Sequence, residues 1–246
     1  MRDIIDAVED GDISAVTSLL DDDPNLVEFS PFGESPLHIA AEQGATDIVR
    51  LLIDRKADVN RLGNNRQTPL HLAAGRGRIQ AAKLLVHHGA KLDLTNDYGY
   101  TPLLAASKRG EVEAAELLLS FGANCDLASA VALGQLNKVK EVLSDNPDAV
   151  RDNRFRSSLL SDAVYSQDSE IVKLLLAEPE IDPNEIGDSG EPPLVAAVSR
   201  SNFNLDIVRL LVQNEADQNQ RSSSGDTAYD RATLVGLNDV DDLFKV

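Results

Sequence analysis

The chain has 246 residues, 42% of them hydrophobic, and a formal net charge of -18. That hydrophobic share is enough for a folded core and excludes an intrinsically disordered chain. The single Cys excludes a disulfide framework and a Cys-based zinc site. The acidic balance argues against a general nucleic-acid binder, because neutralising phosphates requires a surplus of Lys and Arg.

The first residues, Met1-Arg-Asp-Ile-Ile-Asp, lack the apolar stretch of a signal peptide. No run in the chain approaches the roughly 18 apolar residues that a membrane helix needs. We therefore expect a cytoplasmic protein with no membrane partner and no nucleic-acid partner.

Residues 1–30 are predicted to form two short helices on either side of Gly11, with no hairpin before them. This segment holds nine acidic side chains and one basic side chain. A stack of repeats needs a polar outer face at each end, so the segment is expected to be an acidic N-terminal capping unit.

Residues 31–126 contain a repeat of 33 residues, with prolines at positions 36, 69 and 102 and glycines at 44, 77 and 110. The aligned segments are Ser35-Pro-Leu-His-Ile-Ala-Ala, Thr68-Pro-Leu-His-Leu-Ala-Ala and Thr101-Pro-Leu-Leu-Ala-Ala-Ser. Ser or Thr is a good N-cap, Pro is tolerated in the first helical turn, and Gly suits the left-handed residue that ends a helix. Each repeat therefore predicts a first helix, followed by an amphipathic second helix with Leu facing inward.

This unit resembles the ankyrin repeat in its T-P-L-H-x-A-A stretch, in the L-L-x-x-G-A that closes the second helix, and in its period. The resemblance implies an all-α fold, an ankyrin-type helix-turn-helix solenoid with short β-hairpin loops. A single unit cannot bury its apolar face alone, so the units must stack.

The pattern is weaker outside these three repeats. Ala130, Val131 and Gly134 match residues of the N-terminal unit at an offset of 123. We expect three well-formed repeats at 31–126, a hairpin-less, cap-like unit at 127–153, two divergent ankyrin repeats at 154–220 and a C-terminal capping repeat at 221–246. This makes about eight helix pairs, arranged either as two sub-arrays with a seam at 125–153 or as one continuous solenoid.

In the ankyrin family the hairpin tips and the concave face of the first helices usually bind the partner. By position, the resemblance assigns this role to Phe32, Glu34, Gln43, Asn65, Gln67, Arg76, Tyr98, Tyr100, Lys108 and Arg109. The family's turn often has a Gly just before the last tip residue. Arg66 stands there in the second repeat, and a non-Gly residue is strained if its φ is positive, so we expect that hairpin to be altered.

The histidines have structural explanations. His38 and His71 belong to the T-P-L-H stretch, and we expect each imidazole to bond backbone and the repeat's hydroxyl. His87 and His88 end a helix, where cations are favoured, and adjacent side chains point to different sides, so they would not chelate one metal.

No catalytic constellation, metal site or cofactor site is predicted. One modification signal remains: the pattern around Asn60 looks like the acceptor for asparaginyl hydroxylation seen in ankyrin repeats, although it overlaps the ordinary repeat consensus.

We therefore expect a non-catalytic scaffold, not an enzyme, that binds another protein as a monomer. Phe32, Tyr98 and Tyr100 would be its apolar anchors, because Tyr is enriched at binding hot spots. Arg76, Lys108 and Arg109 would contact acidic groups. The alternative is an acidic inhibitor or immunity-like protein that masks a basic enzyme, with the charge of the two acidic ends steering association.

Overall fold

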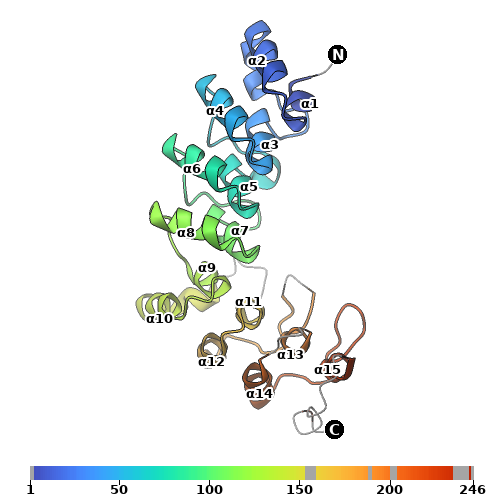
Figure 1. The fold of residues 1–246 in the computed structure, drawn as a ribbon. Helices are drawn as coiled ribbons and strands as arrows, with labels where there is room; N and C mark the ends of the chain where they lie inside the picture. The colour runs from blue at the N-terminus through green and yellow to red at the C-terminus, as the bar shows by residue number, and fades with distance from the viewer. Residues whose placement is uncertain (1–2, 153–158, 188–189, 200–203, 235–243, 245–246) are drawn as a thin grey trace. The chain divides into compact units, whose positions relative to one another are not determined.

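The computed structural model describes residues 3–152, 159–187, 190–199 and 204–234, together with residue 244. These residues form α-helices and short 3-10 turns joined by loops, with no β-strand among them (Figure 1). The chain divides into two compact units, residues 1–125 and 126–246. None of the described helices is long and apolar enough to cross a membrane.

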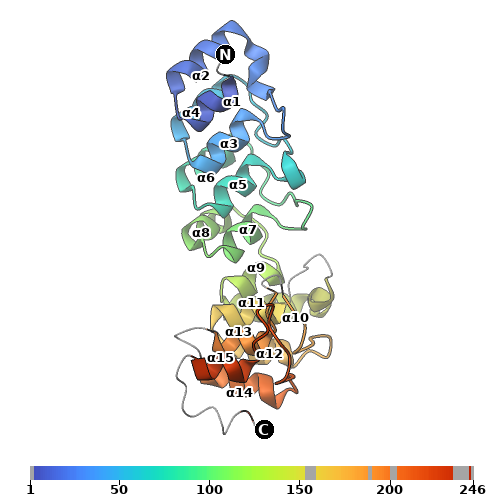
Figure 2. The ribbon, with the colours of Figure 1, turned by 90° about the vertical axis from the view of Figure 1, so that its right-hand side faces the viewer.

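The first unit is a stack of helix pairs. Its helices are α1 (Ile4–Glu9), α2 (Ile13–Asp22), α3 (Pro36–Gln43), α4 (Thr46–Asp54), α5 (Pro69–Gly75), α6 (Ile79–His87), α7 (Pro102–Lys108) and α8 (Val112–Ser120), with 3-10 turns η1 (Pro24–Glu28) and η2 (Asn64–Arg66). The first helix of each pair contacts the first helix of the next pair, and the second helices do the same (Figure 2). Two parallel rows of helices result.

The helix ends have the predicted chemistry. The Thr68 hydroxyl accepts a hydrogen bond from the His71 backbone N–H at 3.3 Å, and Thr101 accepts one from Leu104 at 3.2 Å. Gly44, just after α3, has φ 78°, a left-handed conformation that costs Gly little. Local sequence therefore fixes where these helices begin and end.

Aliphatic and small side chains form the core between the two rows. Equivalent positions of the three repeats are fully buried: Leu37, Leu70 and Leu103, and likewise Ala40, Ala73 and Ala106. Burying one Leu contributes about 2 kcal/mol, and Ala lets neighbouring first helices approach closely. A core of this kind needs few aromatic residues.

Polar side chains in the loops also join neighbouring repeats. The Asn60 side chain accepts a hydrogen bond from the Lys91 backbone N–H at 2.7 Å and donates one to the Gly89 carbonyl oxygen at 3.0 Å. Asp93 accepts one from the Asn124 backbone N–H at 2.9 Å. Each loop is thus fixed by the loop that follows it.

The expected β-hairpin loops are turns rather than strand pairs in the described residues. The Gly63 N–H donates to the Gln67 carbonyl oxygen at 2.8 Å, and Asn96 donates to Tyr100 at 3.0 Å. Each of these hydrogen bonds closes a loop of five residues, which is too short for two strands to pair. The prediction of an altered second tip is confirmed, because Asn65 and Arg66 have φ of 51° and 56°.

The second unit repeats the paired arrangement with weaker local signals. Its helices are α9 (Leu127–Ala132), α10 (Leu136–Asp145), α11 (Leu159–Ser166), α12 (Ser169–Leu176), α13 (Pro193–Val198), α14 (Leu205–Gln213) and α15 (Ala228–Leu234), with 3-10 turn η3 (Pro147–Arg151). The fifteen α-helices found in the described residues fit the predicted helix pairs. The expected second helix of the C-terminal capping repeat, near residue 237, lies outside the described residues.

Candidate functional site

A groove of about 570 Å³ lies in the first unit, along α3 and between the elements on either side of it. It is lined by Ile5, Glu9, Pro31, Phe32, Glu34, Ile39, Glu42, Gln43, Asn64, Arg76 and Arg78. Four of the ten residues assigned to partner binding therefore line one hollow: Phe32, Glu34, Gln43 and Arg76. Its two ends differ in chemistry, because one is at the repeat tips and the other is at the end of α3.

The tip end of the groove combines an exposed aromatic ring with a half-buried carboxylate. Phe32 is 83% exposed, the highest value among the large hydrophobic residues described. Asn64 lies against Gly33, where a Cβ atom would clash with the Asn64 Oδ1 atom. The turn that presents Phe32 therefore requires Gly at this position.

Glu34, two residues after Phe32, has a pKa raised above its ordinary value. Burial is the main cause, the like charge of Glu42 adds to it, and a hydrogen bond with the Asn64 side chain works in the opposite direction. Loss of water and a neighbouring carboxylate both disfavour the ionised form. A cation placed beside Glu34 would favour the ionised form and so act against both effects.

At the other end of the groove the charged side chains are paired within the molecule. Arg76 donates from Nε and Nη2 to the Glu42 Oε1 atom, at 3.0 and 2.7 Å. Arg78 donates from Nε to the Glu42 carbonyl oxygen at 3.0 Å, and Gln43 donates to the Glu9 carbonyl oxygen at 3.2 Å. These contacts join consecutive units, so Arg76 already has an acidic partner.

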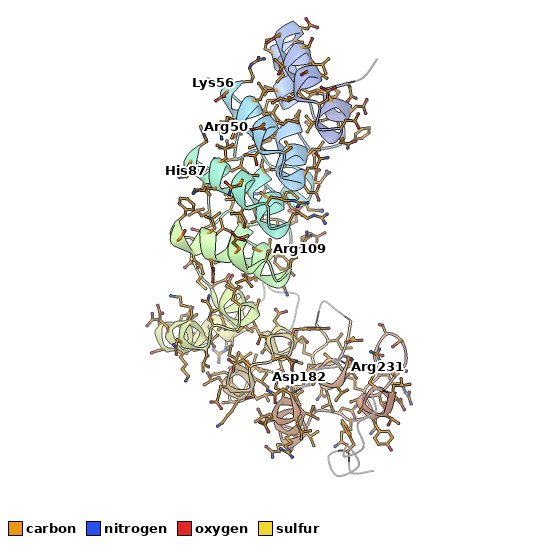
Figure 3. The ribbon with its side chains drawn as sticks, viewed as in Figure 1. Arg50, Lys56, His87, Arg109, Asp182 and Arg231 are labelled. Carbon is orange, nitrogen blue, oxygen red and sulfur yellow. The ribbon has the colours of Figure 1, made fainter. Side chains whose placement is uncertain are left out.

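A second patch lies at the third repeat and is called the tyrosine patch: Tyr98, Tyr100, Lys108 and Arg109. The ring centroids of Tyr98 and Tyr100 are 6.1 Å apart, and Lys108 Nζ lies 5.5 Å from the centroid of Tyr100. Tyr98 is 45% exposed. Arg109 donates from Nη1 to the Gly75 carbonyl oxygen at 3.3 Å. In Figure 3, Arg109 lies on the side of the first helices, opposite Arg50, Lys56 and His87.

Asn65 and Gln67 connect the tips through their backbone. The Asn65 carbonyl oxygen accepts a hydrogen bond from the Asp97 N–H at 2.9 Å. The Gln67 carbonyl oxygen accepts one from His38 Nε2 at 3.1 Å. These two residues fix the spacing of the tips, whatever their side chains contact.

The structural role predicted for His38 and His71 is confirmed. The Thr68 backbone N–H donates to His71 Nδ1 at 3.1 Å, so Nδ1 is an acceptor, and Nε2–H is left to donate to the Tyr100 carbonyl oxygen at 2.9 Å. Burial lowers the pKa of His71 to about 4, although its hydrogen bonds to the backbone of Tyr100 and Leu94 act to raise it. The pKa of His38 is lowered for the same main reason.

His87 and Asn60 have local partners. His87 packs edge-to-face on Phe121, with ring centroids 5.3 Å apart. Within the described ranges, no group of three His, Cys, Asp or Glu side chains is placed to hold a metal ion. Asn60 makes the loop contacts described above, which suffice to explain its pattern. Its hydroxylation stays a prediction.

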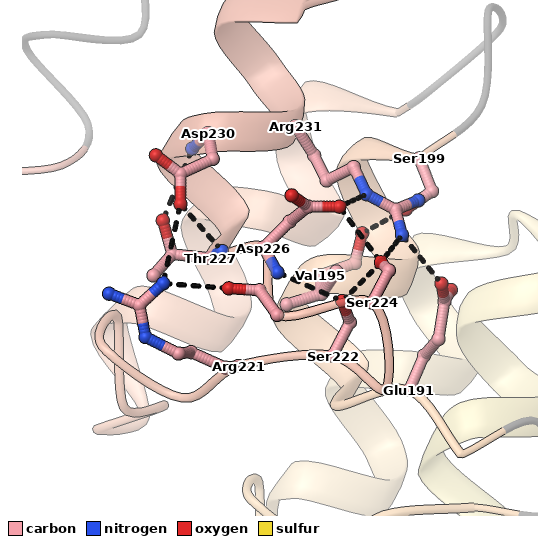
Figure 4. Close-up of polar contacts among 11 residues, drawn as sticks. Glu191, Val195, Ser199, Arg221, Ser222, Ser224, Asp226, Thr227, Asp230 and Arg231 are labelled. Atoms are coloured by element: carbon pink, nitrogen blue, oxygen red, sulfur yellow. Dashed lines mark hydrogen bonds and ion pairs between the residues drawn. The ribbon is translucent and has the colours of Figure 1, made fainter.

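Sequence reasoning missed a polar network in the second unit, centred on Arg231 in α15 (Figure 4). Its guanidinium donates to Asp226 at 2.8 Å, Ser224 at 2.7 Å, Ser199 at 3.2 Å and Glu191 at 3.3 Å. The Arg231 side chain is 24% exposed. Because these partners come from the last tip, from the preceding tip and from the end of α13, the network fixes α15 to its neighbours.

Residues of the groove were also missed, namely Ile5, Glu9, Pro31, Ile39, Asn64 and Arg78. Ile39 follows His38 on α3 and could have been found from helical periodicity. Glu9 and Ile5 could not, because their place depends on how the N-terminal pair stacks on the first repeat.

Comparison with curated proteins finds no significant match. Among solved structures, the chain is similar to the human ASB11 ankyrin repeat domain, with 29% identity and a TM-score of 0.48 over 81% of this chain and 92% of that one. The family model for ankyrin repeats in three copies matches residues 4–96, 56–129 and 160–244. These matches span most of both units. The chain therefore belongs to the ankyrin-repeat family.

Proposed function

We propose that this chain is a non-catalytic scaffold that binds a partner protein through the tips and first helices of its first three repeats. Ankyrin repeats generally mediate protein–protein interaction, which gives the class of function. The observation that carries the finer proposal is the groove, because it lies on this face and presents a Phe side chain that is 83% exposed. An exposed ring on a rigid stack costs little ordering entropy when it binds.

Within this face the apolar residues are the anchors. Phe32 and Tyr98 offer ring surface, whereas Arg76, Lys108 and Arg109 already contact Glu42, the Tyr100 ring and the Gly75 carbonyl oxygen. A partner that used these cations would have to compete for them. The aromatic rings therefore contribute most of the binding free energy, and the cations fix the conformation of the surface through their contacts within the chain. In this proposal the protein is cytoplasmic and acts as a monomer. Light scattering would check the monomeric state.

The test is affinity capture with the full chain, followed by mass spectrometry. We expect a Phe32→Ala, Tyr98→Ala variant to lose specific proteins that the wild type retains. The matched control is Val112→Ala, since Val112 is an exposed apolar residue, 55% exposed, on α8 and outside the groove. Equal capture by all three proteins would refute the proposed face.

The second candidate function is the acidic inhibitor of a basic enzyme. It is favoured by the charge distribution, because residues 1–30 hold nine acidic and one basic side chains, and residues 127–246 hold 21 acidic and 11 basic. Steered association weakens sharply with ionic strength, whereas contact through Phe and Tyr weakens little. Partners that leave the column when salt is added, from wild type and variant alike, would support the inhibitor and exclude the scaffold proposal.

A further inference from the structure

The tip end of the groove has a carboxylate beside an exposed ring, and the hydrogen-bond partner of that carboxylate, the Asn64 side chain, carries no charge. Glu34 is half-buried, and the charged group that acts most on it is Glu42, which has the same sign. The guanidinium of Arg76 is directed at Glu42, and that of Arg78 is held at the carbonyl oxygen of Glu42. Both cations of the groove are therefore engaged by Glu42.

The ring of Phe32 is two residues away from Glu34 on the same short turn. Phe32 is 83% exposed, and Pro31 beside it is also exposed. The position of this turn is fixed, because Asn64 of the next tip lies against Gly33. An aromatic face and a carboxylate are therefore held together on a rigid support at the mouth of the groove.

We propose that this tip end binds an arginine side chain of an extended segment of the partner protein, with apolar neighbours of that arginine packing on Ile39 and Ile5. A guanidinium stacks on aromatic faces and pairs with a carboxylate through its planar fork, so it fits Phe32 and Glu34 together. Lysine would satisfy the charge but not the stacking. Ile39 and Ile5 supply apolar lining farther along the groove.

This inference rests on the proposed function and names the partner chemistry of that site. Its test is an NMR titration of the 15N-labelled full chain with the peptide acetyl-Leu-Arg-Leu-amide. The control peptide carries citrulline in place of arginine, which keeps the shape and removes the charge. We expect saturable shifts at Phe32, Glu34 and Asn64, with affinity about tenfold lower for the citrulline peptide.

Variants decide whether the site or the general acidity of the chain is responsible. Phe32→Ala and Glu34→Gln should each weaken binding about tenfold. Neither change should unfold the stack, because Phe32 is exposed and Gln has the shape of Glu. The matched control is Glu116→Gln, which removes an exposed charge on α8 and should change the affinity less than about twofold. Shifts confined to Asp21–Asp23, or equal weakening by all three variants, would overturn the inference.

The two proposals fail in different ways. If the Phe32→Ala, Tyr98→Ala variant loses captured proteins while the arginine peptide shows no saturable shifts at the tip, the scaffold proposal stands and the arginine site is wrong. If the peptide binds at Phe32 and Glu34 but no captured protein depends on this face, the arginine site stands and the scaffold proposal is wrong.

Discussion

At the scale of single residues, the buried histidines couple stability to pH. His71 is 2% exposed, and burial lowers its pKa to about 4 from an ordinary value of 6.5. Below that ordinary value the unfolded chain binds a proton that the folded chain does not bind, so unfolding becomes easier as the pH falls from 6.5 towards 4. Above 6.5 this contribution to stability is fully present.

We expect protonation of His71 in the unfolded chain to lower the free energy of unfolding by about 2 kcal/mol when the pH falls from 7 to 5. The measurement is urea unfolding of wild type and His71→Leu at both pH values, since Leu104 already occupies this position in the third repeat. His88→Gln, at the exposed end of a helix, is the control and should keep the pH dependence. An identical pH dependence in His71→Leu would refute the assignment.

Two serines stand where the first repeats have histidine. Ser129 and Ser161 are 0% and 2% exposed, and their hydroxyl groups find no hydrogen-bond partner in the described part of the chain. A buried hydroxyl without a partner costs about 1–3 kcal/mol. We therefore expect Ser129→Ala to raise the stability of the second unit by roughly 1 kcal/mol in thermal unfolding.

Ser107→Ala is the matched control for this change. Ser107 is 4% exposed, but its hydroxyl donates to the Leu103 carbonyl oxygen at 2.8 Å. Its replacement removes a made hydrogen bond, so the expected sign is the opposite. Destabilisation by Ser129→Ala as large as that by Ser107→Ala would show that Ser129 is paired after all.

At the scale of elements, the tip of the second repeat is a strained turn. Asn65 and Arg66 both have positive φ, and two such residues in succession define the turn for which Asn-Gly is preferred. Arg66→Gly creates Asn-Gly and relieves about 1 kcal/mol of strain, part of which is offset by the greater freedom of Gly in the unfolded chain. We expect a net gain of roughly 0.5 kcal/mol in urea unfolding.

The neighbouring residue provides the control for this turn. Gln67 has φ -71°, which every residue adopts easily, so Gln67→Gly should destabilise by roughly 0.5–1 kcal/mol. A loss of stability in Arg66→Gly equal to that in Gln67→Gly would mean that the Arg66 conformation is not strained, or that its ion pair with Asp97 at 3.8 Å outweighs the strain.

Helix boundaries were predictable from the sequence where the local backbone conformation requires a particular residue type. Pro69 after Thr68 marks the start of a helix, and Gly44, with φ 78°, marks the end of another. The groove was not predictable, because Arg76 meets Glu42 across 34 residues and its choice of partner depends on side-chain conformation. Sequence placed Phe32 and Tyr98 on one face, yet could not show that only Phe32 lines the hollow.

At the scale of the whole molecule, the two units differ in their buried polar atoms. All three buried side-chain atoms without a partner in the described residues belong to the second unit, on Ser129, Ser161 and Gln167. Gln167 also has φ 61°, where the first repeats have Gly. At about 1–3 kcal/mol for each unpaired group, the second unit is expected to be the less stable one.

We therefore expect amides of residues 126–234 to exchange before those of residues 3–125, and the second unit to unfold first in denaturant. Leu85 and Leu175 are a matched pair, since both are 0% exposed and they lie in different units. Leu→Ala at either site costs about 2–5 kcal/mol. Leu175→Ala should move only the first transition and Leu85→Ala only the second. If both variants move one common transition and protection is uniform, the two units unfold as one and the expected order of unfolding is wrong.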